Sequence, residues 1–540
     1  MLPIPRPTAI AAFVSTLIAL SIGAMSGSLP ATVLGVAQMI GLAIALAATI
    51  PLGRRVRRQK LEFAWWLGHG DPGTGGGAVV PGAPFEVRCF VRHRGTAPLL
   101  LREMTPIAPG GATRASDDDA DSLVAAPIAR TEFTFRLVAP AVGRVVLHGL
   151  AVTLEGPLGL FAVPLYFPNP LAIKVLPQAA ARVPQVARTV TGSPVERSGT
   201  SLRAPQIGGT ELRELREMRP GDPYKSIAWK ASARRGKLLV REVDQEVQET
   251  RYVVLDVSGT MRGGEIGKRK LDFVIEAVAA EARRAIANGD RFGLVTVDGR
   301  VLAHPMPRDG SSQLLRVFDA LIAATEVVDQ DLTDADDEEV VAIVGRYVRQ
   351  QDGVDFSTGR DWNVTGLVRH VQRAMSEAEV KDEPVIASSP ALGLLRRFCR
   401  VRGIPLPYRP DPQGGTKGPG IATVLREIGG RHRSPISLAL VTDLDGLGDP
   451  EPFVAAIKYL RLRGHAVVVV APDATTFAPA PTTPLERELF DVYARGERRR
   501  AGDMRALLAP LGVRVVAVSA GEPAAFVLAR AEGRGARRAA

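Results

Sequence analysis

The stretch R-Y-V-V-L-D-V-S-G-T, residues 251–260, is the clearest indication of the fold of the C-terminal half of the chain. Its apolar residues run without interruption up to Asp256, which is typical of a strand buried on both faces of a parallel sheet. Segments with apolar residues at helical spacing alternate with further apolar runs, at residues 291–298, 436–443, 465–472 and 511–518. We therefore predict an α/β fold for residues 251–540, a parallel sheet with helices on both faces.

Small polar side chains stand where these predicted strands end or the next helix begins. D-V-S-G-T contributes Asp256, Ser258 and Thr260, G-G-T contributes Thr416, and T-D-L-D contributes Thr442, Asp443 and Asp445. Ligands of parallel sheets bind beyond the carboxyl ends of the strands, so these groups are expected to meet at one edge. Their oxygens suit a hard cation such as Mg²⁺, with Mn²⁺ as a second choice, although for any one of these residues alone the capping of a helix is the more common role. Three such loops at one edge of the sheet therefore predict a metal site.

Two apolar stretches at the N-terminus, residues 8–25 and 31–52, contain no charged residue, and a helix that spans a membrane needs about 20 residues. Gly, Ser and Pro between them favour a tight connection, so residues 1–60 are expected to form a transmembrane helix hairpin. By the positive-inside rule, the basic cluster at residues 54–60 faces the cytoplasm. We expect a multi-pass protein of the inner membrane with its soluble domains in the cytoplasm; the alternative is a cleaved signal peptide.

Residues 78–177 differ from the rest because apolar and polar side chains alternate, as in P-F-E-V-R-C-F-V-R-H at residues 84–93. This period of two is the pattern of half-buried strands. With Gly and Pro between the runs, it predicts a small antiparallel β-sandwich. The acidic residues 117–121 are expected to form a solvated loop.

Residues 178–250 connect the two halves and contain a linker, residues 183–208, followed by a dense polar block with Tyr224 and Trp229. Two interpretations of this block stay open. It is either a recognition surface or a salt-bridged connector that packs Trp229 against the next domain.

Composition limits the classes of function. The net charge of +11 lies partly beside the apolar N-terminus and is otherwise mixed with acidic residues, so nucleic acid is not expected as a partner. The two cysteines, Cys89 and Cys399, lie far apart in the sequence and fit a reducing compartment rather than a disulfide framework. The sequence holds neither G-x-x-x-x-G-K-[ST] nor G-x-S-x-G, and an enzyme is not predicted.

The set D-V-S-G-T, G-G-T and T-D resembles the metal-ion-dependent adhesion site of von Willebrand factor A domains, which usually reads D-x-S-x-S. Thr260 stands at the last serine of that pattern and keeps a hydroxyl. The resemblance implies that Ser258, Thr260 and Thr416 contact the metal. It also implies that Asp256 and Asp443 act on the metal directly or through water.

Two further motifs resemble the bacterial family called domain of unknown function 58. They are E-G-P-L-G-L-F at residues 155–161 and R-E-M-R-P-G-D-P-Y-K-S-I-A-W-K-A-S-A-R-R-G-K-L-L-V-R-E at residues 216–242. With the helix hairpin and the β-rich segment, the resemblance covers most of the chain. It implies an adaptor or chaperone-like role beside a MoxR-type AAA+ ATPase.

Residues 325–411 separate the early strands of the C-terminal half from G-G-T and are interpreted as an insertion. Their acidic run at residues 329–339 lacks the central glycine of an EF-hand loop. We interpret this run as a mobile acidic loop.

These observations predict a membrane-anchored, metal-dependent protein-interaction module. One alternative is a metal-dependent hydrolase or phosphotransferase on the same sheet edge, and another is a metal-free scaffold. A D-x-D-x-T phosphatase would carry a second carboxylate at the position of Ser258.

Overall fold

The computed structural model describes residues 3–58, 61–68, 79–95, 98–109, 111–115, 122–181, 211–219, 222, 224–244, 248–375, 385–409 and 415–533. The chain divides into two compact units. Unit 1 comprises Met1–Val183, Glu265–Gly267 and Thr325–Pro410, and unit 2 comprises Pro184–Gly264, Lys268–Ala324 and Asp411–Ala540. The predicted linker at residues 183–208 and the acidic residues 117–121 lie outside the described residues.

Unit 2 is built on a six-stranded sheet in the order β14-β13-β12-β17-β18-β19. All neighbouring pairs are parallel except β13 with β14. The strands are β12 (Thr250–Asp256), β13 (Arg291–Val297), β14 (Val301–Ala303), β17 (Ser437–Val441), β18 (Ala466–Pro472) and β19 (Arg514–Val518). Each parallel strand coincides with one of the apolar runs in the sequence, because a strand covered on both faces needs apolar residues at successive positions.

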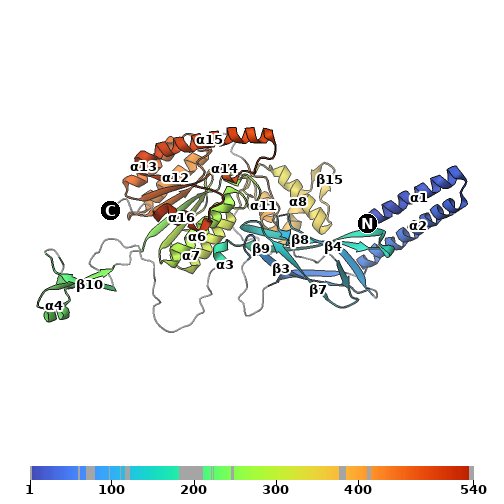
Figure 1. The fold of residues 1–540 in the computed structure, drawn as a ribbon, viewed down its shortest axis with the longest axis horizontal. Helices are drawn as coiled ribbons and strands as arrows, with labels where there is room; N and C mark the ends of the chain where they lie inside the picture. The colour runs from blue at the N-terminus through green and yellow to red at the C-terminus, as the bar shows by residue number, and fades with distance from the viewer. Residues whose placement is uncertain are drawn as a thin grey trace. The chain divides into compact units, whose positions relative to one another are not determined.

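Helices lie on both sides of this sheet (Figure 1). Tyr252 and Val254 of β12 share a buried cluster with residues of α12 and α13, while Val253 and Leu255 point to the opposite face and are also buried. Helix α6 packs with α7 and α16. The helices are α5 (Gly259–Arg262), α6 (Lys270–Ala287), α7 (Ser311–Ala323), α12 (Lys417–Arg431), α13 (Glu451–Leu462), α14 (Ala474–Phe477), α15 (Pro484–Leu508), η3 (Ala509–Leu511) and α16 (Ala524–Gly533).

A small hairpin precedes this sheet in the sequence. Strands β10 (Glu211–Glu217) and β11 (Leu239–Asp244) pair antiparallel, with η2 (Tyr224–Ser226) and α4 (Trp229–Arg235) between them. Ile227, Ala228, Leu239 and Val240 are buried in it. Ser232 fastens α4 to β11, because its Oγ accepts a 2.9 Å hydrogen bond from the Leu239 N–H.

Unit 1 contains two antiparallel sheets, in the orders β1-β9-β8-β4-β6 and β2-β3-β7-β5. One buried cluster draws on both sheets, with Val87 and Phe135 from one and Leu101 and Leu147 from the other. The elements are β1 (Ile4–Pro5), β2 (Glu62–Gly68), β3 (Pro84–Arg92), β4 (Leu99–Ile107), β5 (Thr113–Arg114), β6 (Ser122–Ala125), β7 (Thr131–Val138), β8 (Gly143–Glu155), η1 (Pro157–Gly159), β9 (Phe161–Val175) and α3 (Gln178–Ala181).

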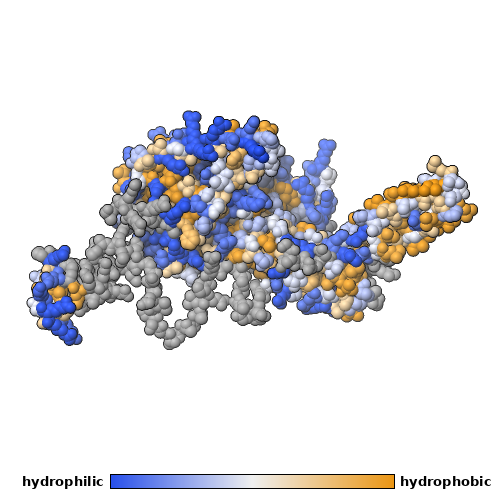
Figure 2. Space-filling model, viewed as in Figure 1, coloured by the Kyte–Doolittle hydropathy of each residue, from blue (hydrophilic) through white to orange (hydrophobic). Residues whose placement is uncertain are grey.

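Two N-terminal helices, α1 (Pro7–Ser26) and α2 (Leu29–Arg58), form a hairpin around Gly27. They are long and apolar enough, by length and composition, to cross a membrane. Most of their apolar side chains are exposed rather than packed in a protein core, and the surface of the hairpin is largely apolar (Figure 2). Gln59 and Lys60 of the predicted basic flank lie outside the described residues.

Residues 325–410 belong to unit 1, whereas the six-stranded sheet belongs to unit 2. Their helices α8 (Asp337–Asp352), α9 (Val364–Ala374) and α11 (Pro390–Arg402) enclose a core of their own, and β15 (Ser357–Thr358) pairs with β16 (Asp361–Trp362). The hydroxyl of Tyr166 on β9 donates to Gln351 Oε1 at 2.8 Å, and a ring nitrogen of His148 on β8 lies 2.7 Å from the Arg402 carbonyl oxygen. The insertion in the sequence of the C-terminal half therefore folds onto the N-terminal half.

The acidic run at residues 329–339 forms turns and irregular backbone up to Asp336 and enters helix α8 at Asp337. Asp336 caps the helix, because its Oδ1 accepts a 2.7 Å hydrogen bond from the Glu339 N–H. Val340, Val344 and Val348 follow at helical spacing and are buried. An acidic first turn is favourable at a helix N-terminus, where the helix dipole is positive.

Candidate functional site

The carboxyl end of β12 places Asp256 at the centre of the site. Asp256 is the last residue of the strand and is fully buried. Its Oδ1 accepts a 3.0 Å hydrogen bond from the Ser258 N–H, and its Oδ2 accepts a 2.7 Å hydrogen bond from the Thr442 hydroxyl. Since Thr442 directly follows β17, the neighbouring parallel strand, the sheet itself brings the two side chains together.

Asp443, the next residue after Thr442, is the second buried carboxylate of the site. Its Oδ1 accepts hydrogen bonds from the Thr260 hydroxyl at 3.1 Å and from the Asp445 N–H at 3.2 Å. Its Oδ2 accepts a 2.5 Å charged hydrogen bond from Nζ of Lys270, the first residue of α6.

Lys417, the first residue of α12, lies between the two carboxylates with its side chain only 3% exposed. Its Nζ donates to Asp256 Oδ2 at 2.7 Å, to Asp443 Oδ1 at 2.6 Å and to Thr260 Oγ1 at 2.9 Å. An ammonium group has three donors, and all three have acceptors here.

The two carboxylates keep this buried ammonium charged. Burial alone would lower the pKa of Lys417, but Asp256 and Asp443 outweigh it and raise that pKa above its ordinary value. Burial likewise opposes the charge of Asp443, while Lys417 and Lys270 hold the pKa of Asp443 below its ordinary value.

Glycines allow α12 to bring Lys417 this close. A Cβ built on Gly420 would lie 2.7 Å from the carbonyl oxygens of Asp298 and Gly299, just beyond β13, and a Cβ on Gly418 would overlap the Leu447 carbonyl. Only a residue without a side chain permits these approaches.

Four of the five predicted ligands meet at this edge of the sheet. Asp256, Thr260 and Asp443 all contact Lys417, and Ser258 Oγ lies 3.2 Å from Thr260 Oγ1. Thr416 is exposed at the position before α12, and its side chain lies against Gly299.

The residues that our sequence reasoning missed are the two lysines, Lys270 and Lys417. Lys417 directly follows G-G-T, and this proximity to a predicted ligand is the one feature of the sequence that could have indicated its place in the site. A lysine at the start of a helix is ordinarily solvated, so its burial could not be read from its position alone.

The side chains as placed do not fit a divalent cation. All four carboxylate oxygens of Asp256 and Asp443 accept hydrogen bonds from protein donors. Mg²⁺ would need oxygens at about 2.0–2.1 Å, and the oxygens facing the centre are those that bind Lys417. Among the described residues, no group of three or more His, Cys, Asp or Glu side chains could hold a metal ion.

The outer rim of the site is formed by α15 and the loop after Asp443. Arg500 donates to Asp445 Oδ1 at 2.6 Å and also pairs with Glu497. Burial, with a further contribution from Asp445, raises the pKa of Glu497 against the opposing effect of Arg500. The rim therefore carries its own ion pairs, beside those of the buried cluster.

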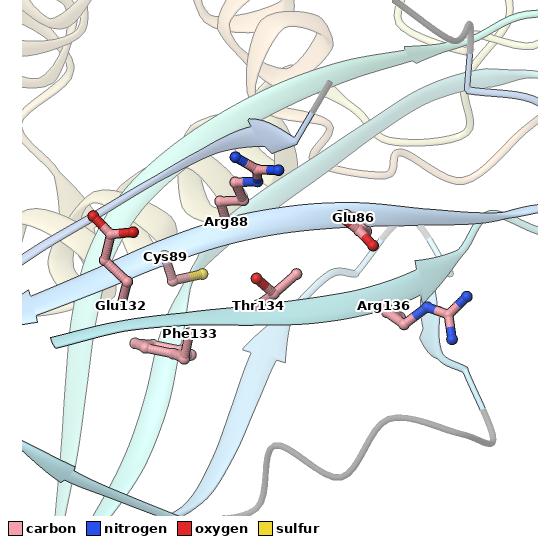
Figure 3. Close-up of a pocket in the computed structure, with 7 residues that line it drawn as sticks. All are labelled: Glu86, Arg88, Cys89, Glu132, Phe133, Thr134 and Arg136. Atoms are coloured by element: carbon pink, nitrogen blue, oxygen red, sulfur yellow. The ribbon is translucent and has the colours of Figure 1, made fainter. Parts of the chain in front are cut away.

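A pocket elsewhere in the chain lies on β3 and β7 of unit 1 (Figure 3). Glu86, Arg88, Glu132, Thr134 and Arg136 alternate along the two strands, with Cys89 and Phe133 between them. It shares no residue with the buried cluster of unit 2.

Comparison with known proteins gives a family match and likenesses to several solved structures, among them the two that follow. No curated protein matches the chain. The ApaA protein of Bordetella pertussis is 12% identical, with a TM-score of 0.17, over 22% of this chain and 94% of that one. A von Willebrand factor type A structure from Catenulispora acidiphila is 10% identical, with a TM-score of 0.22, over 53% of this chain and 42% of that one. Residues 214–347 match the family described as "Protein of unknown function DUF58", so the resemblance expected from residues 216–242 is confirmed over this stretch.

Proposed function

We propose that this chain is a membrane-anchored protein-interaction module whose partner binds the hairpin between β10 and β11. One observation carries the proposal: Tyr224 and Trp229 are 75% and 62% exposed in the segment that matches the family. Tyr and Trp are the residue types that most often dominate binding at protein interfaces.

The hairpin does not need these aromatic residues for its own core. Ile227, Ala228, Leu239 and Val240 supply its buried side chains. Lys225 and Lys230, each one residue after an exposed aromatic, are exposed as well. An aromatic surface with basic neighbours favours a protein partner with an acidic, partly apolar face.

The partner class that we propose is a MoxR-type AAA+ ATPase, in line with the family resemblance. We further propose that α1 and α2 anchor the chain in the inner membrane, with the soluble parts in the cytoplasm. That the interaction depends on Mg²⁺ stays a prediction. The arrangement of the side chains argues against it, because the carboxylate oxygens of Asp256 and Asp443 already accept hydrogen bonds from protein donors.

The test is the affinity of the full chain, in detergent or nanodiscs, for a purified MoxR-type ATPase from the same genome. Truncation of an interface anchor typically costs about 2 kcal/mol or more, so Trp229→Ala and Tyr224→Ala are each expected to weaken binding by roughly 30-fold. Trp66→Ala is the matched control, because Trp66 is an exposed tryptophan on β2, 40% exposed. Equal affinities for wild type and both hairpin variants would reject the hairpin, and no binding by the wild type would reject this partner.

Two alternatives have their own tests. A hydrolase or phosphotransferase would need access to a carboxylate, whereas Asp256 is fully buried and hydrogen-bonded through both oxygens. Turnover of a phosphate ester that is lost in Asp256→Ala would favour the enzyme. A scaffold would bind the partner equally well with and without added Mg²⁺ and with either hairpin variant.

A further inference from the structure

The four charged side chains at the carboxyl end of the sheet balance one another. Asp256 and Asp443 carry two negative charges, and Lys417 and Lys270 carry two positive charges. The most exposed of the four side chains, Lys270, is only 11% exposed. A buried charge without a partner is strongly unfavourable, so the equal number of positive and negative charges stabilises the fold. A divalent cation bound in this cluster would leave a buried excess of positive charge.

Lys417 also occupies the geometric position of a central cation. Its Nζ lies within 2.9 Å of oxygens from three separate segments: Asp256 at the end of β12, Thr260 in α5 and Asp443 after β17. Carboxylate and hydroxyl oxygens that converge on one point are the ligand set of a hard divalent cation. Here the point is taken by an ammonium group that is covalently part of the chain.

We propose that Lys417 is a built-in cation that replaces a divalent metal, and that removal of its ammonium group converts the cluster into a metal site. The ligands released would be Asp256 Oδ2, Asp443 Oδ1 and Thr260 Oγ1. Lys270 stays on the other oxygen of Asp443 and contributes nothing to the position of the metal. The wild-type edge of the sheet is thus complete without Mg²⁺ or Mn²⁺.

The proposal concerns the edge of the sheet, while the proposed function depends on the exposed aromatics of the hairpin. The two proposals involve different residues, so an experiment can reject one of them without affecting the other.

The experiment is Mn²⁺ titration of the full chain in detergent after treatment with a chelator, followed by electron paramagnetic resonance of free Mn²⁺ and by calorimetry. The wild type is expected to show no saturable binding up to about 1 mM, the weak end of protein cation sites. Lys417→Ala is expected to gain one saturable site at least about tenfold tighter than that limit. The double variant Lys417→Ala with Asp443→Ala is expected to lose the gained site.

Lys270→Ala is the matched control, because it removes the same charge from the same cluster but leaves Lys417 between the carboxylates. It is expected to bind no more Mn²⁺ than the wild type. Lys417→Ser repeats the test with a residue that can itself offer a hydroxyl, and circular dichroism shows which variants are folded. Mn²⁺ is also expected to raise the melting temperature of Lys417→Ala but not that of the wild type.

Three outcomes would overturn the proposal. One is saturable Mn²⁺ binding by the wild type that disappears in Asp256→Ala, which would establish the ordinary adhesion-type site. Another is a folded Lys417→Ala or Lys417→Ser protein that takes up no Mn²⁺. A third is a gain in Lys270→Ala as large as that in Lys417→Ala. If neither Lys417 variant folds, the wild-type titration still decides, because saturable binding there contradicts a built-in cation and its absence supports one.

Discussion

Thr442 connects the buried carboxylate of Asp256 to the loop that carries Asp443. Its hydroxyl donates to Asp256 Oδ2 at 2.7 Å and accepts a 3.2 Å hydrogen bond from the Leu444 N–H. Leu444 has a positive φ of 61°, a conformation that non-glycine residues seldom adopt. The hydroxyl therefore supports both the charge of Asp256 and a strained residue of the loop.

Thr442→Val is expected to lower the local free energy of unfolding by about 1–3 kcal/mol, the usual cost of leaving buried polar groups without a partner. The side chain keeps its shape, so the loss comes from the hydroxyl. Amide hydrogen exchange of β12 and β17 measures the change. Thr442→Ser keeps the hydroxyl and is expected to retain most of the stability. Exchange rates equal to those of the wild type in the valine variant would show that the hydroxyl is dispensable.

At the scale of elements, the first turn of α12 determines whether the lysine reaches the carboxylates. Gly420 lies against the carbonyl oxygens after β13, while Gly430, near the end of the same helix, has its nearest neighbour at 3.9 Å from a built Cβ. The two glycines therefore differ although they lie in the same helix: a side chain at Gly420 would clash with backbone atoms, whereas a side chain at Gly430 has room.

Gly420→Ala is expected to lower the stability of α12 by about 1–3 kcal/mol, because the added methyl group must displace backbone. Gly430→Ala is the matched control and is expected to raise stability by up to about 1 kcal/mol, since Ala favours a helix more than Gly does. Hydrogen exchange of the α12 amides compares the two. Equal effects of the two substitutions would mean that the close approach of α12 to the loop after β13 is not constrained.

The segments of the β-rich middle and of the six-stranded sheet could be anticipated from local patterns, because alternation and apolar runs are properties of neighbouring residues. The packing of residues 325–410 within unit 1 could not. It depends on pairs such as Tyr166 with Gln351, which are remote in sequence. The start of helix α8 at Asp337 falls inside the acidic run, where the local composition favours a loop, and the helical spacing of Val340, Val344 and Val348 begins only after it.

At the scale of the whole molecule, the topology of the chain in a membrane is the testable consequence of the α1–α2 hairpin. The turn at Gly27 is expected on the outer side and the soluble parts in the cytoplasm. Both cysteines of the chain, Cys89 and Cys399, are buried. A newly introduced exposed cysteine can therefore be labelled against a low background.

Ser28→Cys, in the turn of the hairpin, is expected to react with a membrane-impermeant maleimide in intact spheroplasts. Leu462→Cys replaces a side chain that is 78% exposed in unit 2 and is expected to react only after lysis. Gel mobility of the labelled protein reads out both variants. Labelling of Leu462→Cys in intact spheroplasts would show that the topology is the opposite of the one predicted. Release of the protein from the membrane fraction by alkaline carbonate would show that α1 and α2 do not anchor it in the membrane.

Local patterns in the chain are enough to predict the apolar hairpin, the alternating strands of the middle, the apolar runs of the sheet and four of the residues that gather at its edge. These follow from patterns among near neighbours and from the rule that parallel strands end at a common edge. The position of Lys417 between Asp256 and Asp443 and the exposure of Trp229 are visible only in the folded chain. A lysine is buried only when distant segments supply carboxylates to balance its charge, and that condition is met by the assembled fold rather than by any local stretch of residues.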